Sequence, residues 1–300
     1  MKIIITGSLG HISKPLVNIL VQKKYSVTVI SSKAERQKAI EAAGATAAIG
    51  SMEDANFLTA TFKGADIVYV MEAVGAHNFF DKNFDIMAAI DRIVNSYKEA
   101  IQQSGVKRVI HLSSIGAHTD KGNGMLAFHY NAEKILQQLP NDGTIKFMRP
   151  VGFYYNMFAF IPTIKTQNCI VSNYGGDEKE PWVSPLDIAK TIAEEIEKPF
   201  TGREIRYIAS DEVSPNEVAT ILGKAIGKPG LKWQVIPDEQ FMNGLLAAGM
   251  NTQAARGLTE MNAGRRNGVV YEDYYRNKPL LGNIKLVDFA KEFGAGYNQQ

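Results

Sequence analysis

The sequence predicts an α/β fold with a doubly wound parallel sheet, and three observations support this prediction. Short β-branched apolar runs alternate with helical patterns through the first half of the 300-residue chain. The turn after the first run contains two glycines, Gly7 and Gly10, and leads directly into a helical pattern. Strands joined by helical crossovers lie parallel, with helices on both faces of their sheet. We therefore expect ligands to bind beyond the carboxyl ends of the strands.

Six strands and five helices can be placed in order along residues 1–150. The strands are short apolar runs, expected at residues 2–6, 26–30, 45–49, 66–71, 106–112 and 144–148. The helices repeat apolar residues at helical spacing and are expected at residues 11–23, 33–43, 52–62, 81–103 and 126–139. Gly105 and Pro140 are typical stop signals for the last two helices.

The second half of the chain has a less regular pattern. An aromatic stretch at residues 153–158 opens it. Strands are expected at residues 167–172, 204–208 and 231–236, and helices at 185–197, 215–226, 238–248 and 251–264. We expect residues 1–150 to form the ligand-binding domain and residues 151–300 a smaller α/β lobe. Strands of that lobe can return to the main sheet, as late strands often do in doubly wound folds.

The strand–turn–helix at the start of the chain predicts a dinucleotide site. Backbone N–H groups at the positive end of a helix attract a pyrophosphate. Gly7 permits the tight turn, Gly10 permits close approach of the phosphates, and Ser13 stands where a third small residue is needed for packing. This spacing resembles that of the short-chain dehydrogenase/reductase superfamily. The residues expected at the cofactor here are Gly7, Ser8, Leu9, Gly10, His11 and Ile12.

The end of the second strand favours NADP(H) over NAD(H). An NAD site usually has an acidic residue there to bind the ribose 2′-hydroxyl. This chain has hydroxyls and cations instead, which suit a 2′-phosphate: Ser31, Ser32, Lys33 and Arg36. The alternative is that a serine caps the next helix while Lys33 and Arg36 face solvent, and both interpretations can hold together.

Further cofactor contacts are expected where the other strands end. Ser51 stands where members of the superfamily often have an adenine-binding Asp, so a contact there must come from its hydroxyl or backbone. The residues expected around the cofactor at these ends are Gly50, Ser51, Met52, Met71, Glu72, Ser113, Pro150, Gly152 and Phe153.

Three side chains are catalytic candidates. Tyr130 and Lys134 lie four residues apart on one face of an expected helix, and Ser113 follows the fifth strand. Short-chain enzymes use such a set: the lysine binds the nicotinamide ribose and lowers the tyrosine pKa, so that the phenol exchanges a proton with a carbonyl. The alternative is an exposed tyrosine and lysine on a solvated face. The apolar stripe of the helix lies opposite both, so they face water or a cleft.

Several segments in series resemble the NmrA-like family, a branch of atypical short-chain dehydrogenase/reductases with the Rossmann fold. They are residues 128–134, with His129, Glu133 and Lys134, residues 148–156, with Arg149, Pro150 and Phe153, and residues 182–189 and 214–219. The family includes NADPH-dependent quinone reductases and redox-sensing regulators. Many members keep the lysine and lack the tyrosine, which implies that Lys134 anchors the cofactor and that Tyr130 is incidental.

The resemblance leaves three functions open. The first is an NADPH-dependent oxidoreductase that reduces a small carbonyl or quinone by direct hydride transfer. The second is a sensor that binds NADP(H) without turnover and changes its partner protein. The third is a nucleotide-sugar epimerase or dehydratase with tightly held NAD, which the lack of an acidic residue after the second strand disfavours.

Composition narrows the class of protein further. A formal net charge of +2 argues against a nucleic-acid partner. The single cysteine, Cys169, excludes a disulfide within the chain and a cysteine cluster for a metal, and suits a cytoplasmic location. No apolar stretch is long enough for a membrane span, and the glycines interrupt any signal peptide at the start. His111 and Cys169 are expected in the core.

Overall fold

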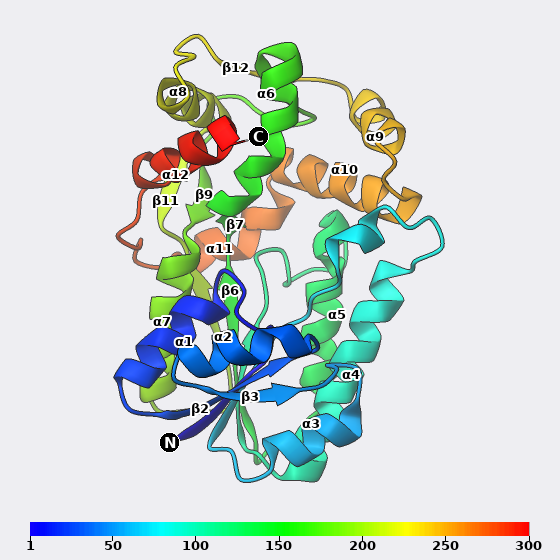
Figure 1. Ribbon diagram of the computed structural model, residues 1–300. Helices are drawn as coiled ribbons and strands as arrows, with labels where there is room; N and C mark the ends of the chain where they lie inside the picture. The colour runs from blue at the N-terminus through cyan, green and yellow to red at the C-terminus, as the bar shows by residue number, and fades with distance from the viewer. Residues whose placement is uncertain (300) are drawn as a thin grey trace.

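Seven parallel strands form the central sheet of the computed structural model, which describes residues 1–299 (Figure 1). Their order across the sheet is β10-β6-β5-β4-β1-β2-β3. The strands are β1 (Lys2–Ile5), β2 (Ser26–Ser31), β3 (Thr46–Ile49), β4 (Ile67–Val70), β5 (Arg108–Leu112), β6 (Thr144–Pro150) and β10 (Arg203–Ile208). Because β1 pairs with both β2 and β4, the strand order reverses beside the glycine-rich turn, which is where doubly wound sheets bind ligands. The predicted fold class is confirmed.

Alternating side chains of the strands create two apolar faces, each covered by helices. Ile3 and Ile5 belong to one buried cluster and Ile4 to the other, as the two-residue period of a strand requires. The first face is covered by α1 (Ser13–Gln22), α2 (Gln37–Ala42) and α7 (Pro185–Glu197). The second is covered by α3 (Ala55–Phe62), α4 (Ile86–Ser104) and α5 (Ala127–Leu136). The central sheet is therefore the middle layer of a three-layer α/β arrangement, with helices on both of its faces.

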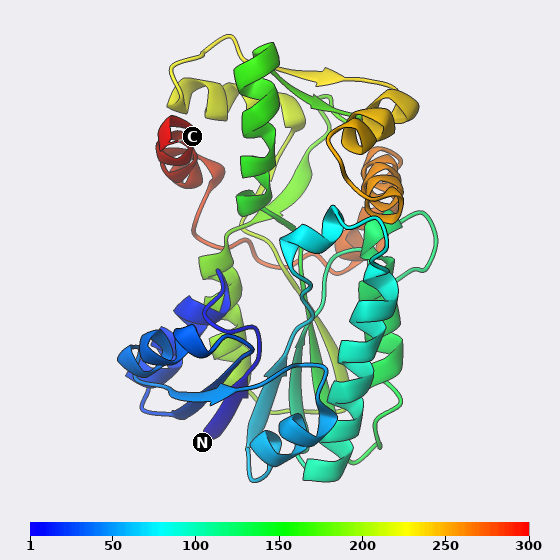
Figure 2. The same ribbon diagram turned by 45° about the vertical axis from the view of Figure 1, so that its right-hand side comes forward.

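A second lobe lies beyond the carboxyl ends of the strands, and the turned view separates it from the sheet (Figure 2). It contains the small sheets β11-β9-β7 and β12-β8. Its strands are β7 (Gly152–Phe153), β8 (Cys169–Ser172), β9 (Glu180–Val183), β11 (Asp211–Val213) and β12 (Lys232–Val235). Its helices are α6 (Ile161–Gln167), α8 (Pro215–Ala225), α9 (Asp238–Ala247), α10 (Thr252–Arg266), α11 (Glu272–Arg276) and α12 (Leu286–Gln299). A third buried cluster forms its core.

The chain crosses between the lobes several times. After the second lobe has begun, α7 packs on α1 and β10 pairs with β6, with Arg203 opposite Ile145. The chain then returns to the second lobe at β11. The main sheet thus contains a strand from the second half of the sequence.

Several element boundaries differ from the sequence prediction. The helix expected at 33–43 is a 3₁₀ turn (Ala34–Arg36) followed by α2, and the helix expected at 81–103 starts at Ile86. Asp85 sets that start because its side chain accepts a hydrogen bond from the Ala88 N–H. Short strands such as β7, β9 and β11 were not predicted, since two to four residues show no readable period. No helix within residues 1–299 has the length and apolarity that crossing a membrane requires.

Candidate cofactor groove

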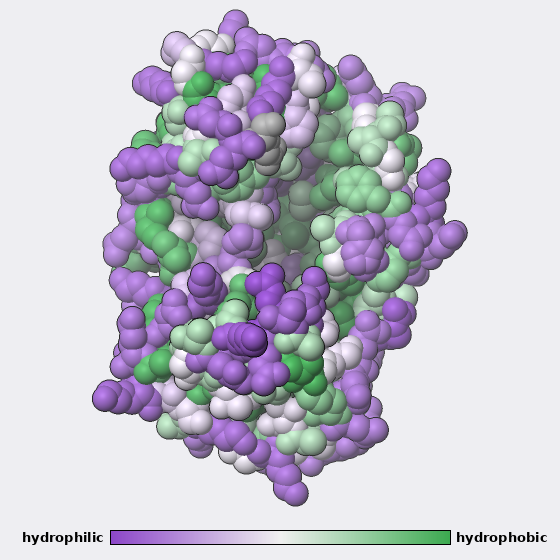
Figure 3. All heavy atoms as spheres, viewed as in Figure 1, coloured by the Kyte–Doolittle hydropathy of each residue, from purple (hydrophilic) through white to green (hydrophobic). Residues whose placement is uncertain are grey.

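A groove of about 430 Å³ lies at the carboxyl ends of β1, β2 and β4. It is lined by residues 7–10, 30–33, 51–53 and 73–75, with Arg36 and Ile93. Figure 3 shows the surface hollowed between the two lobes, with hydrophobic side chains inside the hollow. Ten of the predicted cofactor residues meet in this groove: Gly7, Ser8, Leu9, Gly10, Ser31, Ser32, Lys33, Arg36, Ser51 and Met52.

The glycine-rich turn has the geometry that the sequence suggested. Gly7 has φ +84° and Ser8 has φ +56°, so two successive residues adopt the left-handed region. A Cβ on Gly7 would lie 2.8 Å from the Met71 Sδ, so any other residue here needs the Met71 side chain to shift and also adopts an unfavourable backbone conformation. Ser13 begins α1, and its Oγ donates to the Thr6 carbonyl at 3.3 Å. No side chain caps this helix, so a ligand meets no competing acceptor at its start.

The hydroxyls and cations after β2 lie along the same groove. The Ser8 Oγ donates to the Ser31 Oγ at 3.1 Å, and the Ser31 Oγ accepts from the Lys33 N–H at 3.2 Å. Ser32, Lys33 and Arg36 are exposed. Within residues 1–299 the side chains of Lys33 and Arg36 have no hydrogen bond or ion pair, so both positive charges are available to an anion in the groove.

Two of the catalytic candidates, Tyr130 and Lys134, lie on α5, and the third, Ser113, directly follows β5. Tyr130 is half-buried and Lys134 exposed on α5, and the Lys134 Nζ lies 5.4 Å from the centre of the Tyr130 ring. This is a cation–π contact, not a hydrogen bond to the phenol oxygen. Ser113 is buried, and its Oγ donates to the Glu133 Oε1 at 2.6 Å.

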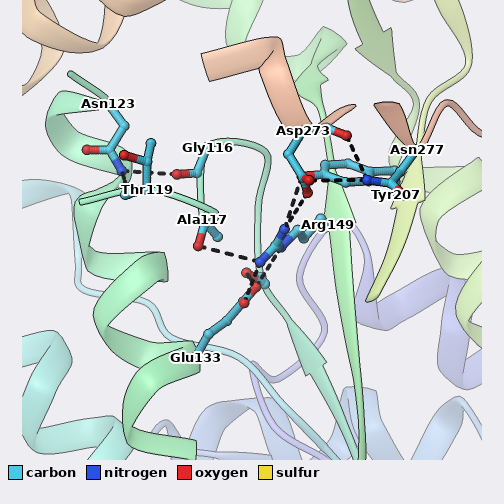
Figure 4. Close-up of polar contacts among 10 residues, drawn as sticks. Gly116, Ala117, Thr119, Asn123, Glu133, Arg149, Tyr207, Asp273 and Asn277 are labelled. Carbon is cyan, nitrogen blue, oxygen red and sulfur yellow. Dashed lines mark hydrogen bonds and ion pairs between the residues drawn. The ribbon is translucent and has the colours of Figure 1, made fainter. Parts of the chain in front are cut away.

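Figure 4 shows Glu133 and Arg149 at the centre of a polar network. Both side chains are buried, and Glu133 accepts the Ser113 hydrogen bond. Arg149 binds Glu133 through two N–H···O bonds, from Nε at 2.8 Å and from Nη2 at 2.6 Å. Its Nη1 donates to Asp273 on α11 at 2.9 Å and to the Tyr207 hydroxyl at 3.1 Å. The burial of Arg149 would lower its pKa, but Glu133 and Tyr207 outweigh that effect and raise it, so the guanidinium stays charged. The network ties α5, β6 and the second lobe together.

The other predicted cofactor residues do not line the groove. Gly50 packs on the Phe57 ring, Met71 covers Gly7, and Glu72 is buried against His111. The His11 ring lies against the ring of Tyr155 in the second lobe, with ring centres 3.8 Å apart and planes tilted by 38°. The remaining ones are Ile12, which precedes α1, Pro150 at the end of β6, and Gly152 and Phe153 in β7.

The sequence reasoning missed part of the groove. Ile30, Glu53, Ile93 and residues 73–75 line it and were not predicted. Residues 73–75 follow the end of β4, so the rule that ligands bind beyond strand ends could have found them. Glu53 precedes α3 and Ile93 lies in α4, and no motif marks either residue.

The family model that matches this chain is the NmrA-like family, over residues 1–274. The chain belongs to the NmrA-like family. A relative of this NmrA-like protein is an uncharacterized sugar epimerase of Bacillus subtilis, 27% identical over 209 residues that cover 67% of this chain and 90% of the relative. Another is an uncharacterized protein of Schizosaccharomyces pombe, 25% identical over 249 residues that cover 76% of this chain and 82% of the relative.

Solved structures share the fold at low identity. The NADPH-dependent quinone oxidoreductase of Escherichia coli, complexed with NADPH, superposes with a TM-score of 0.81 at 20% identity, covering 97% of this chain and 99% of the other. The Citrobacter sp. triphenylmethane reductase complexed with NADP(H) gives a TM-score of 0.73 at 16% identity, covering 97% and 99%. The NmrA-like chain thus has a Rossmann-type fold, as the sequence predicted.

Proposed function

We propose that this protein is an NADPH-dependent oxidoreductase that reduces a small carbonyl or quinone by direct hydride transfer. The observation that carries the proposal is the groove: a left-handed glycine turn at an uncapped helix start lies beside Lys33 and Arg36, two cations without protein partners. These features match the pyrophosphate and the 2′-phosphate of NADPH. Two structures that share the fold are described as complexes with NADPH and with NADP(H), which supports the choice of nucleotide.

The residues of the groove have distinct roles in this proposal. The turn at residues 7–10 holds the pyrophosphate through backbone N–H groups, and Ser32, Lys33 and Arg36 hold the 2′-phosphate. Lys134 anchors the nicotinamide ribose from α5. When bound, the nicotinamide supplies the hydride, so the protein has to orient the ring and exclude water. The second lobe beyond the strand ends performs that exclusion.

Lys134 is expected to matter more than Tyr130. Lys134→Ala removes the proposed ribose anchor and is expected to weaken NADPH binding and lower kcat together. Tyr130→Phe is expected to change kcat less than about tenfold, since the phenol has no hydrogen bond to Lys134. Steady-state kinetics with a quinone and an aldehyde, together with NADPH titrations, measure both effects. A loss of about 10²-fold or more in kcat for Tyr130→Phe would instead make the phenol a general acid.

The preference for NADPH is expected to depend on Lys33 and Arg36. The double variant Lys33→Ala/Arg36→Ala removes both cations and is expected to raise the Kd for NADPH by about 10-fold or more while changing the Kd for NADH little, because only NADPH carries the 2′-phosphate. Fluorescence titrations with both nucleotides measure the ratio of the Kd for NADH to the Kd for NADPH. Lys38→Ala is a matched control, since Lys38 is exposed on the same segment and does not line the groove. An unchanged ratio would refute the assignment of the 2′-phosphate site.

A second candidate function is a sensor that binds NADP(H) without turnover. The observation that favours it is the Ser113 hydroxyl, which donates to Glu133 and is buried, so it is not presented as the substrate-binding serine of a short-chain enzyme. A sensor would bind NADPH tightly and fail to oxidise it with any acceptor. Direct hydride transfer needs no serine, so turnover with a quinone separates the two functions.

A further inference from the structure

Glu72 and His111 form an ion pair that is completely buried beside the groove. The His111 Nε2 lies 2.8 Å from the Glu72 Oε1, and neither side chain has exposed surface. The other polar atoms of the pair, the Glu72 Oε2 and the His111 Nδ1, have no hydrogen-bond partner among the described residues. The two groups therefore depend on each other, because a buried charge without a partner is strongly unfavourable.

The charged groups around His111 favour its protonated form. Burial would lower its pKa, but the charge and the hydrogen bond of Glu72, with a further contribution from Glu133 on α5, outweigh burial and raise the pKa above the ordinary value of 6.5. Arg149 on β6 opposes this rise. His129 on α5 also faces His111, and burial followed by the charge of His111 lowers its own pKa well below the usual range, so it stays neutral.

Glu72 belongs to the segment that walls the groove. Residues 73–75 line the groove and follow Glu72 directly. The residue before it, Met71, is held at its N–H by the Thr6 Oγ1 at 3.0 Å and at its carbonyl by the Tyr97 hydroxyl at 2.7 Å. The bond between Glu72 and His111 is the next anchor along the chain and directly precedes residues 73–75, while the Gly75 carbonyl accepts a bond from the Asn78 N–H at 2.9 Å.

We propose that the Glu72–His111 ion pair positions the groove wall at residues 73–75, so that nucleotide affinity depends on the charge of His111. The inference rests on the proposed function, in which this groove binds NADPH. Loss of the proton from His111 leaves the carboxylate of Glu72 with only a neutral donor, and the anchor weakens. Because the pKa of His111 is raised, the anchor is complete at pH 6.5 and below and is lost as the pH rises through that raised value. NADPH affinity therefore falls toward alkaline pH.

The test is the Kd for NADPH between pH 6.5 and 9.5, measured by nicotinamide fluorescence for wild type and for His111→Gln, which keeps a donor and cannot titrate. We expect the wild-type Kd to rise about fivefold or more across this range, and the Kd of His111→Gln to change much less. His118→Gln is the matched control: His118 is half-buried and does not line the groove, so it is expected to keep the wild-type profile. If the Glu72–His111 pair only stabilises the fold, the thermal midpoint will change with pH, but the Kd of His111→Gln will show the same pH dependence as that of wild type.

A second measurement needs no variant and no nucleotide. The hydrogen-exchange protection of the amides at residues 73–75 in wild type, corrected for intrinsic rates, is expected to fall over the same pH range. A wild-type Kd that stays flat above pH 7, or protection that does not change, would overturn this inference. A wild type that binds neither NADPH nor NADH at any pH would instead refute the proposed function, so the two failures can be told apart.

Discussion

Replacing Arg149 by leucine is expected to lower the free energy of unfolding by about 3–5 kcal/mol, since it leaves the carboxylate of Glu133 buried without a cation. The Glu133 side chain is 3% exposed, and each of its two carboxylate oxygens accepts a hydrogen bond from the Arg149 guanidinium. The same change removes the bond to Asp273 that joins β6 to α11 of the second lobe. Urea unfolding, followed by far-UV circular dichroism and tryptophan fluorescence, measures the loss.

The controls for this prediction separate burial from charge. Arg276→Leu removes an arginine from α11 whose partner Glu272 lies 3.8 Å away, both largely exposed, so we expect a change below about 1 kcal/mol. Arg149→Leu with Glu133→Leu removes both charges and is expected to recover part of the loss. Arg149→Lys keeps the positive charge but loses the pair of hydrogen bonds that the guanidinium makes to Glu133. Its free energy of unfolding is therefore expected to lie between those of wild type and Arg149→Leu. If Arg149→Leu and Arg276→Leu lower the free energy of unfolding equally, the buried Arg149–Glu133 pair is not a major source of stability.

Gly7→Val is expected to raise the Kd for NADPH by about 100-fold or more. A β-branched residue at φ +84° costs roughly 1–3 kcal/mol of backbone strain. Its Cβ would also lie 2.8 Å from the Met71 Sδ, so the Met71 side chain or the turn has to shift at the proposed pyrophosphate position. Nicotinamide fluorescence titration measures the change.

Gly64→Val is the matched control for the glycine turn. Gly64 has φ +71° with no atom within 4 Å of the place a Cβ would take, and it lies between α3 and β4, away from the groove. It is therefore expected to bear a similar backbone strain and to leave the Kd for NADPH unchanged. If Gly7→Val binds NADPH like wild type, the turn at residues 7–10 is not the phosphate site.

The sequence was sufficient to predict the main sheet and to bring together the residues that line the groove at the ends of β1 and β2, because both depend on local signals. Each strand of residues 1–150 is an apolar run between turn residues, and the glycines, hydroxyls and cations of the groove lie within two short stretches, at residues 7–10 and 31–36. Where strands are parallel, their carboxyl ends meet at one edge, so local motifs were enough to place these residues together.

The rest of the site depends on contacts between residues far apart in the sequence. Arg149 meets Asp273 across 124 positions, and His111 meets Glu72 across 39. A single sequence shows an arginine at the end of a strand and a histidine within one, and it does not show their partners. His111 was expected in the core, which is where it lies, but its pairing with Glu72 could not be read from the pattern.

The second lobe was harder to predict for a different reason. Its strands have two to four residues. Tyr154 and Phe158, from the aromatic stretch at residues 153–158, pack with Phe289 in the core of the lobe. Aromatic residues at close spacing serve a core and a substrate pocket equally well, so only the arrangement in space decides between them.

The most direct test of the central claim is a titration of the purified protein with NADPH and, separately, NADH, followed by addition of simple quinones and aldehydes. We expect the protein to bind NADPH more tightly than NADH, and bound NADPH to be oxidised only after a quinone or aldehyde is added. Tight binding without oxidation by any acceptor would contradict the reductase and favour the sensor. NAD that co-purifies with the protein would favour an epimerase, and failure to bind either nucleotide would contradict the assignment of the groove itself.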